Sequence, residues 1–275
     1  MASVWSYEES RVIVSGGGGA GMGAAVVREL ARQGAEIHVL DLREPPVDVA
    51  SYEAVDLRDP DATAAAVARI GGRVDALFNC AGLPGIKFPD LDVMLVNFCG
   101  MRHLAELVSE HMGAGSAICS ISSTAGAGYL ANIAKWMPLV TSPGFAAAKQ
   151  WCEEHPDDIA GGYAPSKEAI IVWTLWASYK LADKGIRLNC ISPGPTETPM
   201  MPDFEATVGK EFMEAFPVPL GRRSLPEEQA YPMVFLNSKA ASFITGENFI
   251  TDGGTMGAIM TGSIDITTLI PASMQ

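Results

Sequence analysis

A tyrosine and a lysine stand four residues apart in Tyr163-Ala164-Pro165-Ser166-Lys167, where a stretch of helical period begins. Residues four apart share one face of an α-helix, and Pro165 is tolerated because it falls in the first turn. A free phenol has a pKa of about 10, and an ammonium group beside it favours the ionised form. The pair is therefore a candidate for proton exchange with a bound molecule.

A glycine-rich segment, residues 15–23, lies between a short apolar run and an alanine- and valine-rich stretch. Glycines allow a pyrophosphate to approach the backbone, and the amino end of a following helix directs free N–H groups towards it. This context predicts a dinucleotide site. Two spacings fit and neither is preferred: G-x-G-x-x-G at Gly16, Gly18 and Gly21, or G-x-x-x-G-x-G at Gly17, Gly21 and Gly23.

Asp41 ends the next apolar run, about 20 residues after Gly21. A carboxylate at this place can accept hydrogen bonds from both hydroxyls of an adenosine ribose, and it would repel a 2′-phosphate. The sequence therefore favours NAD over NADP, although Arg43 lies nearby. The alternative is an aspartate that caps a turn.

Short β-branched apolar runs alternate with helical stretches, which is typical of βαβ units and a parallel sheet. Strands are expected at residues 11–15, 35–41, 52–55, 74–79, 116–121, 186–191 and 248–251. Helices are expected at residues 21–33, 60–70, 92–111, 163–184 and 226–238. We predict an α/β fold: one Rossmann-like domain over residues 1–275, doubly wound around a parallel seven-stranded sheet.

The segment 126–162 fits no βαβ period and predicts a helical insertion, with short helices at residues 131–137 and 143–154. It carries four aromatic residues, Tyr129, Trp136, Phe145 and Trp151. These could wall a pocket or cover a neighbouring subunit, and the alternative is a solvated helical hairpin.

Composition excludes several classes of protein. The 19 Lys+Arg are outnumbered by 32 Asp+Glu, which gives a net charge of −13, and the basic residues form no patch for nucleic acid. The histidines and the five cysteines show neither metal-ligand spacing nor a disulfide pattern. The sequence also shows no membrane segment and no secretory signal, so the cytoplasm is the expected location.

The order of further motifs resembles the short-chain dehydrogenase/reductase family, over nearly the whole chain. The motifs are Val55-Asp56-Leu57, Asn79-Cys80-Ala81-Gly82, Asn97, Ile121-Ser122-Ser123, Tyr163 with Lys167, Asn189, Pro193-Gly194 with Thr198, and Asp252-Gly253-Gly254. The resemblance implies an NAD-dependent alcohol dehydrogenase or carbonyl reductase. The branch it looks most like includes coniferyl-alcohol dehydrogenases and 3α-hydroxysteroid dehydrogenase/carbonyl reductases.

By this resemblance, Tyr163 is the acid/base that exchanges a proton with the substrate oxygen, and Lys167 favours its phenolate. Ser123 hydrogen-bonds the reacting oxygen, whereas strand alternation sends Ser122 to the other side. Asn97 is expected to hold a water beside Lys167 and complete a proton path.

The cofactor-binding residues implied by the resemblance are Gly17, Gly21, Met22, Gly23, Asp41, Leu42, Asp56, Leu57, Asn79, Ala81, Gly82, Tyr163, Lys167, Pro193, Gly194, Thr196 and Thr198. Asp56 is expected to accept from the adenine amino group, and Asn79 to steady the sheet beside the cofactor. Thr198 and the main chain of Ile191 are expected to contact the nicotinamide carboxamide.

Two features depart from the family pattern. The family's hydroxyl residue before its first glycine falls on Gly16, so that hydroxyl contact is missing or the loop has gained a glycine. The interval between Ser123 and Tyr163 is much longer than in most members, which places the insertion directly before the catalytic helix.

Apolar residues follow Thr198, where the family keeps its substrate loop: Met200, Met201, Phe204, Phe212, Met213 and Phe216. They favour a hydrophobic or aromatic alcohol or carbonyl substrate, although they could also pack a core helix. A homo-oligomer, dimer or tetramer, is expected from the family. The competing hypothesis is a dinucleotide-sensing or scaffold protein without catalysis.

Overall fold

A single parallel sheet forms the centre of the molecule. The computed structural model describes residues 3–85, 87–209, 211 and 216–265. Within these residues seven strands pair in the order β3-β2-β1-β4-β5-β6-β7, every pair parallel. The strands are β1 (Arg11–Ser15), β2 (Glu36–Asp41), β3 (Ser51–Ala54), β4 (Ala76–Asn79), β5 (Ala117–Ile121), β6 (Arg187–Pro193) and β7 (Asn248–Thr251). The predicted doubly wound, Rossmann-like sheet is confirmed.

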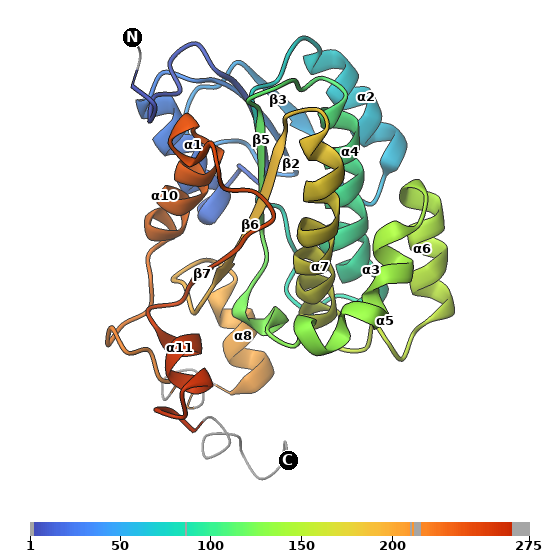
Figure 1. The fold of residues 1–275 in the computed structure, drawn as a ribbon, viewed down its shortest axis with the longest axis vertical. Helices are drawn as coiled ribbons and strands as arrows, with labels where there is room; N and C mark the ends of the chain where they lie inside the picture. Colours follow the sequence, from blue (N-terminus) through green and yellow to red (C-terminus); the bar gives the residue numbers. More distant parts are fainter. Residues whose placement is uncertain (1–2, 86, 210, 212–215, 266–275) are drawn as a thin grey trace.

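Helices cover both faces of this sheet. On one side α1 and α10 pack together, and on the other lie α2, α4 and α7, with α5 and α6 outside them (Figure 1). The described helices are α1 (Met22–Arg32), α2 (Pro60–Ile70), α3 (Asp90–Met94), η1 (Leu95–Gly100), α4 (Met101–Ser109), η2 (Thr124–Gly126), α5 (Tyr129–Thr141), α6 (Gly144–Glu154), α7 (Tyr163–Ala182), α8 (Met201–Val208), α10 (Pro226–Asn237), η3 (Lys239–Ala241) and α11 (Thr255–Met260). Each helical layer encloses its own hydrophobic cluster against the sheet.

Local sequence explains where several elements begin and why the sheet is central. Helix α2 begins after Asp59, whose side chain accepts from the Ala62 N–H, and Pro60 occupies its first turn. Strand β5 is buried at every position because helices cover both its faces, as expected of a central parallel strand.

The order of strands reverses between β1 and β4. Strand β1 pairs with β2 on one side and with β4 on the other, so the connections leave it in opposite directions. Crevices at the carboxyl ends of strands next to such a switch point are the usual ligand sites of open α/β sheets. The fold therefore presents the ends of β1, β4, β5 and β6 for function.

One predicted helix is wrong in detail. The single helix expected over residues 92–111 is instead α3, the π-helical turn η1 and α4. At Gly100 a Cβ atom would lie 2.4 Å from the carbonyl oxygen of Leu57, so a glycine is required for this close approach. π-turns of this kind insert one residue into a helix and are frequent at functional sites; this one contains Asn97.

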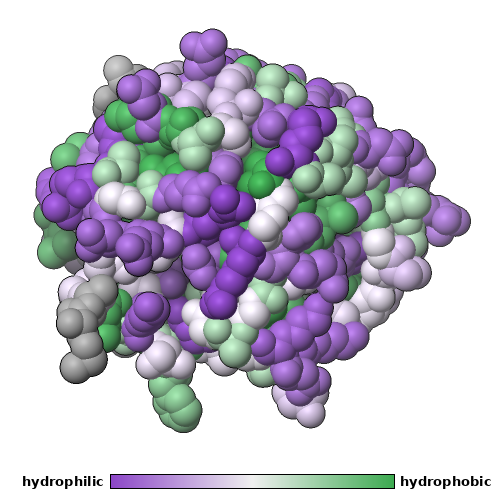
Figure 2. Space-filling view, turned by 90° about the horizontal axis from the view of Figure 1, so that it is seen from above, coloured by the Kyte–Doolittle hydropathy of each residue, from purple (hydrophilic) through white to green (hydrophobic). Residues whose placement is uncertain are grey.

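The surface away from the carboxyl ends is mostly polar. Viewed from above, hydrophilic side chains alternate with small apolar areas over the face at the amino ends of the strands (Figure 2). No helix in the described part of the chain combines the length and the apolar character needed to cross a bilayer.

Candidate active site

One strand end and one helix start bring Ser123, Tyr163 and Lys167 together. Ser123 follows β5, Tyr163 is the first residue of α7, and Lys167 lies one turn further on. The Lys167 ammonium nitrogen is 5.3 Å from the centroid of the Tyr163 ring, and the Ser123 hydroxyl hydrogen-bonds the Tyr163 phenol. The three side chains therefore face one another at the carboxyl edge of the sheet.

The ammonium group of Lys167 is held by the main chain of β5. Lys167 is only 4% exposed, and its Nζ donates to the carbonyl oxygen of Ile121 at 2.9 Å. A buried amine loses the hydration that stabilises its charge, so burial lowers the pKa of Lys167 to about 8. The pKa of the amine therefore lies close to neutral pH, where the group can release or accept a proton.

Burial acts on Tyr163 in the opposite direction. It raises the pKa of the Tyr163 phenol to about 12, and the hydrogen bond with Ser123 opposes this only in part. The sequence predicted that Lys167 would set this pKa by favouring the phenolate. Burial is the main cause of the shift in this structure, and the role of Lys167 in favouring the phenolate stays a prediction.

Asn97 connects the site to the loop after β4. Its side chain is buried, accepts from the Leu83 N–H at 2.7 Å, and donates to the Leu83 carbonyl and to the Ser166 hydroxyl, both at 3.1 Å. Both amide hydrogens are thus used by the protein, so the predicted hold on a water does not come from a free side-chain N–H. The role of Asn97 in a proton path stays a prediction.

Ser166 is a residue that the sequence analysis missed. It is completely buried, donates to the Tyr163 carbonyl at 2.6 Å and accepts from Asn97, so it joins the π-turn to the catalytic helix. Its position three residues after Tyr163, in the first turn of a helix, was the signal available in the sequence.

The glycine-rich loop packs too closely for side chains at several positions. Gly16 has φ +70, and a Cβ there would lie 2.3 Å from the Ala81 nitrogen. At Gly23 a Cβ would meet the Gly16 carbonyl oxygen at 2.1 Å. Gly17 is enclosed by valine side chains, and Gly18 would meet the Arg43 carbonyl oxygen at 2.0 Å. Glycines of both candidate spacings are therefore required, and the packing does not separate the two.

The amino end of α1 fits a pyrophosphate. Gly21 is the N-cap residue and provides no side-chain cap, and no atom lies within 4 Å of a Cβ built on it. Met22 begins the helix and Gly23 is buried directly behind it. The first-turn N–H groups therefore face open space without a side-chain acceptor, which is the arrangement that anions bind at helix N-termini.

Asp41 faces this loop from the end of β2. Its carboxylate accepts from the Gly18 N–H at 2.7 Å and from the Arg43 N–H at 2.9 Å. A guanidinium nitrogen of Arg43 lies 3.4 Å from the Cβ position of Gly19, and the neighbouring Leu42 is 66% exposed. The carboxylate of Asp41 thus lies at the glycine-rich loop with a cation beside it, and its role towards a ribose stays a prediction.

The two predicted adenine-side residues are used differently from expectation. The carboxylate of Asp56 accepts from the Arg58 guanidinium at 2.6 Å, which lowers the pKa of Asp56, and Arg58 also reaches Asp92 at 2.8 Å. Leu57 is buried in the core, so only its main chain is available to a ligand. The acceptor role of Asp56 towards an adenine amino group stays a prediction.

The segment after β4 runs between the glycine loop and the catalytic helix. Asn79 donates to the Ser120 hydroxyl at 3.1 Å and so bridges β4 and β5, while its own side-chain oxygen is buried without a partner in the described structure. Ala81 contacts Gly16, and the Cβ position of Gly82 lies 4.0 Å from the Lys167 amine. These residues line the path from the loop to Lys167.

The chain after β6 is fastened to the neighbouring strand end. A Cβ on Gly194, which follows Pro193, would lie 2.9 Å from the Cα of Asp252. The Thr196 hydroxyl hydrogen-bonds the Gly194 carbonyl at 3.0 Å and the Ser224 hydroxyl at 2.9 Å. Thr196 is therefore committed to structure, while the carbonyl of Thr198 accepts from Met201 at the start of α8.

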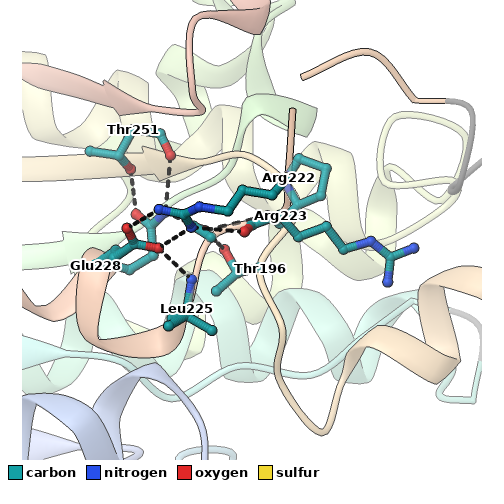
Figure 3. Close-up of polar contacts among 9 residues, drawn as sticks. Thr196, Arg222, Arg223, Leu225, Glu228 and Thr251 are labelled. Carbon is teal, nitrogen blue, oxygen red and sulfur yellow. Dashed lines mark hydrogen bonds and ion pairs between the residues drawn. The ribbon is translucent and has the colours of Figure 1, made fainter. Parts of the chain in front are cut away.

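A polar network supports this segment from outside. Arg222 and Glu228 form an ion pair at 2.6 Å, Glu228 also accepts from the Leu225 N–H, and Gln229 is hydrogen-bonded to Thr251 (Figure 3). A cavity of about 510 Å³ borders these residues, and its lining includes none of Ser123, Tyr163 or Lys167. We assign this network to support of the loop rather than to chemistry.

Helix α8 covers Tyr163, the predicted catalytic tyrosine. The Phe204 ring meets the Tyr163 ring edge-on at 4.9 Å, and an ion pair between Lys87 and Asp203 joins α8 to the loop after β4. Met201 is buried. Part of the predicted apolar substrate loop is thus placed at the site, whereas Phe212 and Met213 lie outside the described residues.

The insertion buries some of its aromatic side chains. Trp136 is 1% exposed and Phe145 8% exposed, and both belong to the core, with Tyr129 and Trp151 packed partly against it. Trp136 and Phe145 therefore pack in the core, Tyr129 and Trp151 stay partly exposed, and the role of the insertion as a pocket wall or a subunit contact stays a prediction. These buried side chains pack inward because α5 lies on α7, and α6 lies on η1 and α4.

The described residues contain no group of three or more histidine, cysteine, aspartate or glutamate side chains placed to hold a metal ion.

Taken together, the fold and the site define a dinucleotide-binding α/β protein whose tyrosine, lysine and serine meet at the carboxyl edge of the sheet.

Comparisons with known proteins agree with this class. A model described as short chain dehydrogenase matches residues 11–136, and one described as Enoyl-(Acyl carrier protein) reductase matches residues 146–256. A coniferyl-alcohol dehydrogenase of Pseudomonas sp. (strain HR199 / DSM 7063) is 30% identical over 246 residues, 89% of this chain and 96% of that protein. The 3-alpha-hydroxysteroid dehydrogenase/carbonyl reductase of Comamonas testosteroni is 33% identical over 257 residues, 88% of this chain and 95% of that protein.

A solved structure is also similar. The 3-alpha-hydroxysteroid dehydrogenase from Pseudomonas sp. B-0831, crystallised with NADH, superposes with a TM-score of 0.76 at 29% identity, covering 93% of this chain and 100% of that one. The chain belongs to the short-chain dehydrogenase/reductase family. It is an oxidoreductase of alcohol and carbonyl substrates that uses a dinucleotide cofactor.

Proposed function

We propose that the protein is an NAD-dependent dehydrogenase/reductase that interconverts a hydrophobic or aromatic alcohol and its carbonyl. The observation that carries the proposal is the meeting of the Ser123 hydroxyl, the Tyr163 phenol and the Lys167 amine at the end of the glycine-loop crevice. A coniferyl-alcohol-like or hydroxysteroid-like substrate is the chemistry suggested by the names of the two relatives.

In the oxidation direction, Tyr163 reacts as its phenolate, after its own proton has passed to the neutral form of the Lys167 amine; the phenolate then takes the proton of the substrate hydroxyl, and Ser123 donates a hydrogen bond to the same oxygen. When bound, the dinucleotide supplies a nicotinamide ring that accepts the hydride from the carbinol carbon. Lys167 then releases the proton that it received from Tyr163 along the proposed path past Asn97. Because the amine has a pKa of about 8, it can relay a proton near neutral pH.

The cofactor would lie across the strand ends. In this proposal its pyrophosphate lies at Gly21, Met22 and Gly23, and Asp41 with the main chain of Leu42 holds the adenosine ribose. The remaining proposed contacts along the crevice are Gly17, Asp56, Leu57, Asn79, Ala81, Gly82, Pro193, Gly194, Thr196 and Thr198. The preference for NAD rests on the carboxylate of Asp41.

The substrate would lie between Tyr163 and α8. The edge of the Phe204 ring already meets Tyr163, so a flat apolar substrate can replace or extend this contact. We further propose that the protein is a homo-oligomer. We also propose a location in the cytoplasm, since all five cysteines are free thiols.

A screen of aromatic, terpenoid and steroid alcohols at high pH, followed by NADH absorbance, tests the proposal. We expect turnover with at least one class, and Tyr163→Phe is expected to abolish it while NADH binding persists. If no alcohol in the screen is turned over although NADH binds measurably, the result would instead support a dinucleotide sensor without catalysis. Residual turnover above a few per cent in Tyr163→Phe would reject the role of Tyr163.

A further inference from the structure

A carboxylate next to Lys167 connects the catalytic helix to the insertion. Glu168 accepts a hydrogen bond from the indole nitrogen of Trp136 at 2.6 Å and another from the side-chain amide of Asn132 at 2.8 Å, both on the same carboxylate oxygen. Hydrogen bonds to an ionised carboxylate are short and roughly twice as strong as neutral ones. Helix α5 is thus attached to α7 at the residue that directly follows the lysine.

The main chain at Lys167 is confined from the other sides as well. The Ser122 hydroxyl donates to the Lys167 carbonyl at 2.8 Å, and the side chain of Lys167 reaches Ile121. At Gly126 a Cβ would lie 2.9 Å from the carbonyl carbon of Lys167, so η2 is packed directly against this turn of α7. The contact between Glu168 and α5 confines this turn of α7 on the side of the insertion.

The far end of α5 has its own anchor. Arg102, on α4, is fully buried and donates to the Leu139 carbonyl at 3.0 Å, the Ser142 hydroxyl at 3.2 Å and the Gly144 carbonyl at 2.7 Å. These acceptors lie at the end of α5 and in the turn to α6, where a cation is favoured by the helix dipole. Helix α5 is therefore held at both ends and can act as a rigid support for Glu168.

We propose that Glu168 is a positioning residue: through Trp136 and Asn132, the insertion fixes the main chain at Lys167 so that the ammonium stays beside the Tyr163 phenol. The proposal rests on the function proposed above. It assigns to the insertion a role behind the catalytic helix, in place of the pocket wall or subunit contact that its length first suggested.

Loosening this support would admit water to a buried pair. The groups that face Lys167 are Tyr163 on its own helix and the thiols of Cys80, after β4, and Cys190, on β6. Hydration would relieve the burial that lowers the pKa of Lys167 from 10.5 to about 8 and raises the pKa of Tyr163 from 10.0 to about 12. Misplacement also slows reaction, since a shift of about 1 Å can cost on the order of 100-fold.

The test uses three variants and a matched control in the full-length chain. Glu168→Ala removes the acceptor, Glu168→Gln keeps an acceptor oxygen, and Trp136→Phe removes one donor but keeps a ring in the core. Trp151→Phe is the control, because it makes the same substitution in the same insertion at a ring that stacks on His155 and packs against Trp136 with centroids 6.0 Å apart, whereas the donor to Glu168 is Trp136. Each is measured for kcat and for kcat/KM against pH with an alcohol that the wild type oxidises.

We expect Glu168→Ala to lower kcat by at least about tenfold. We also expect it to move the acid limb of the kcat/KM profile to higher pH by half a unit or more, because Lys167 must be neutral to receive a proton and hydration raises its pKa from about 8. The kcat of Glu168→Gln should lie within about threefold of wild type. The kcat of Trp136→Phe should lie between those of Glu168→Ala and Glu168→Gln, and Trp151→Phe should keep the wild-type profile. A wild-type profile in Glu168→Ala, or equal loss in Glu168→Gln and Glu168→Ala, overturns the proposal.

A second readout is independent of activity. Hydrogen exchange by mass spectrometry over residues 164–170 is expected to be at least about tenfold faster in Glu168→Ala and Trp136→Phe, and unchanged in Trp151→Phe. If the wild type oxidises no alcohol yet this pattern appears, the proposed function fails while the positioning contact stands. Unchanged exchange in Glu168→Ala rejects the positioning contact whatever the activity.

Discussion

Tyr163 and Lys167 show how burial, and not only sequence spacing, sets the protonation of a catalytic pair. Desolvation raises the pKa of the phenol to about 12 and lowers that of the amine to about 8. At neutral pH the amine is protonated inside the protein, which is unfavourable for folding. The pair is thus kept for chemistry at a cost in stability.

Replacing the lysine is expected to separate these two effects. Lys167 has a folded pKa of about 8, below its ordinary 10.5, so it destabilises the fold below pH 8 and this cost disappears as pH rises to 10.5. Lys167→Met should therefore abolish turnover yet raise the free energy of unfolding at pH 7 by about 2 kcal/mol. Urea titrations at pH 7 and pH 10 measure this; a loss of stability at pH 7 contradicts the assignment.

Asp41 and Arg43 offer a second test with single residues. Removing the carboxylate in Asp41→Ala takes away the charge that repels a 2′-phosphate, so the ratio of kcat/KM for NAD to that for NADP should fall by at least about tenfold. Arg43→Ala is the matched variant, and it should shift the ratio towards NAD because it removes the cation at Gly19. Steady-state kinetics with both cofactors measures the ratios, and a wild type that prefers NADP would refute the carboxylate argument.

At the scale of elements, the start of α1 combines close packing with open space. Gly16 and Gly23 cannot carry a Cβ without moving backbone atoms, whereas nothing lies near the Cβ position of Gly21. The loop is therefore built tightly behind the helix N-terminus and left free in front of it. This arrangement reserves the first-turn N–H groups for a ligand.

Gly21→Ala is expected to affect binding without affecting folding. Its backbone, at φ −86, suits alanine, so the thermal midpoint should stay within about 2 °C of wild type. The added methyl group fills the space proposed for the pyrophosphate, so NADH affinity should fall at least about tenfold. Gly113→Ala, at another open glycine, is the control. Unchanged NADH affinity in Gly21→Ala would remove the loop from the cofactor site.

The sheet of the whole molecule has two edge strands, β3 and β7. Strand β7 ends the sheet, and its Phe249 and Ile250 are 39% and 45% exposed. An apolar edge strand tends to pair with another chain unless it is covered. The insertion covers α4 and α7, because α6 packs on α4 and α5 packs on α7. Strand β7 is therefore the edge that we expect to be available for association.

The proposed homo-oligomer should therefore depend on this edge. We expect sedimentation at micromolar concentration to give a dimer or tetramer for the wild type, and a smaller species for the double variant Phe249→Asp, Ile250→Asp. Circular dichroism checks that the variant is folded. A monomeric wild type, or an unchanged assembly in the variant, contradicts the expectation.

The sequence by itself determined the succession of strands and helices along the chain and most helix limits, including α2 at residues 60–70, and it placed β1 at residues 11–15. Spacing alone placed Tyr163 and Lys167 on one helix face, and the resemblance to the family implied that Ser123 joins them. These are consequences of local periodicity and of a regular fold.

The tertiary structure alone decided what surrounds those residues. It showed that burial governs the two pKa values, that Asn97 lies in a π-turn, and that Trp136 points inward to Glu168. Each of these depends on contacts between segments far apart in the chain, and on how much water they exclude. Residue type and spacing carry no measure of either quantity, which is why the sequence could place the catalytic groups but not set their protonation.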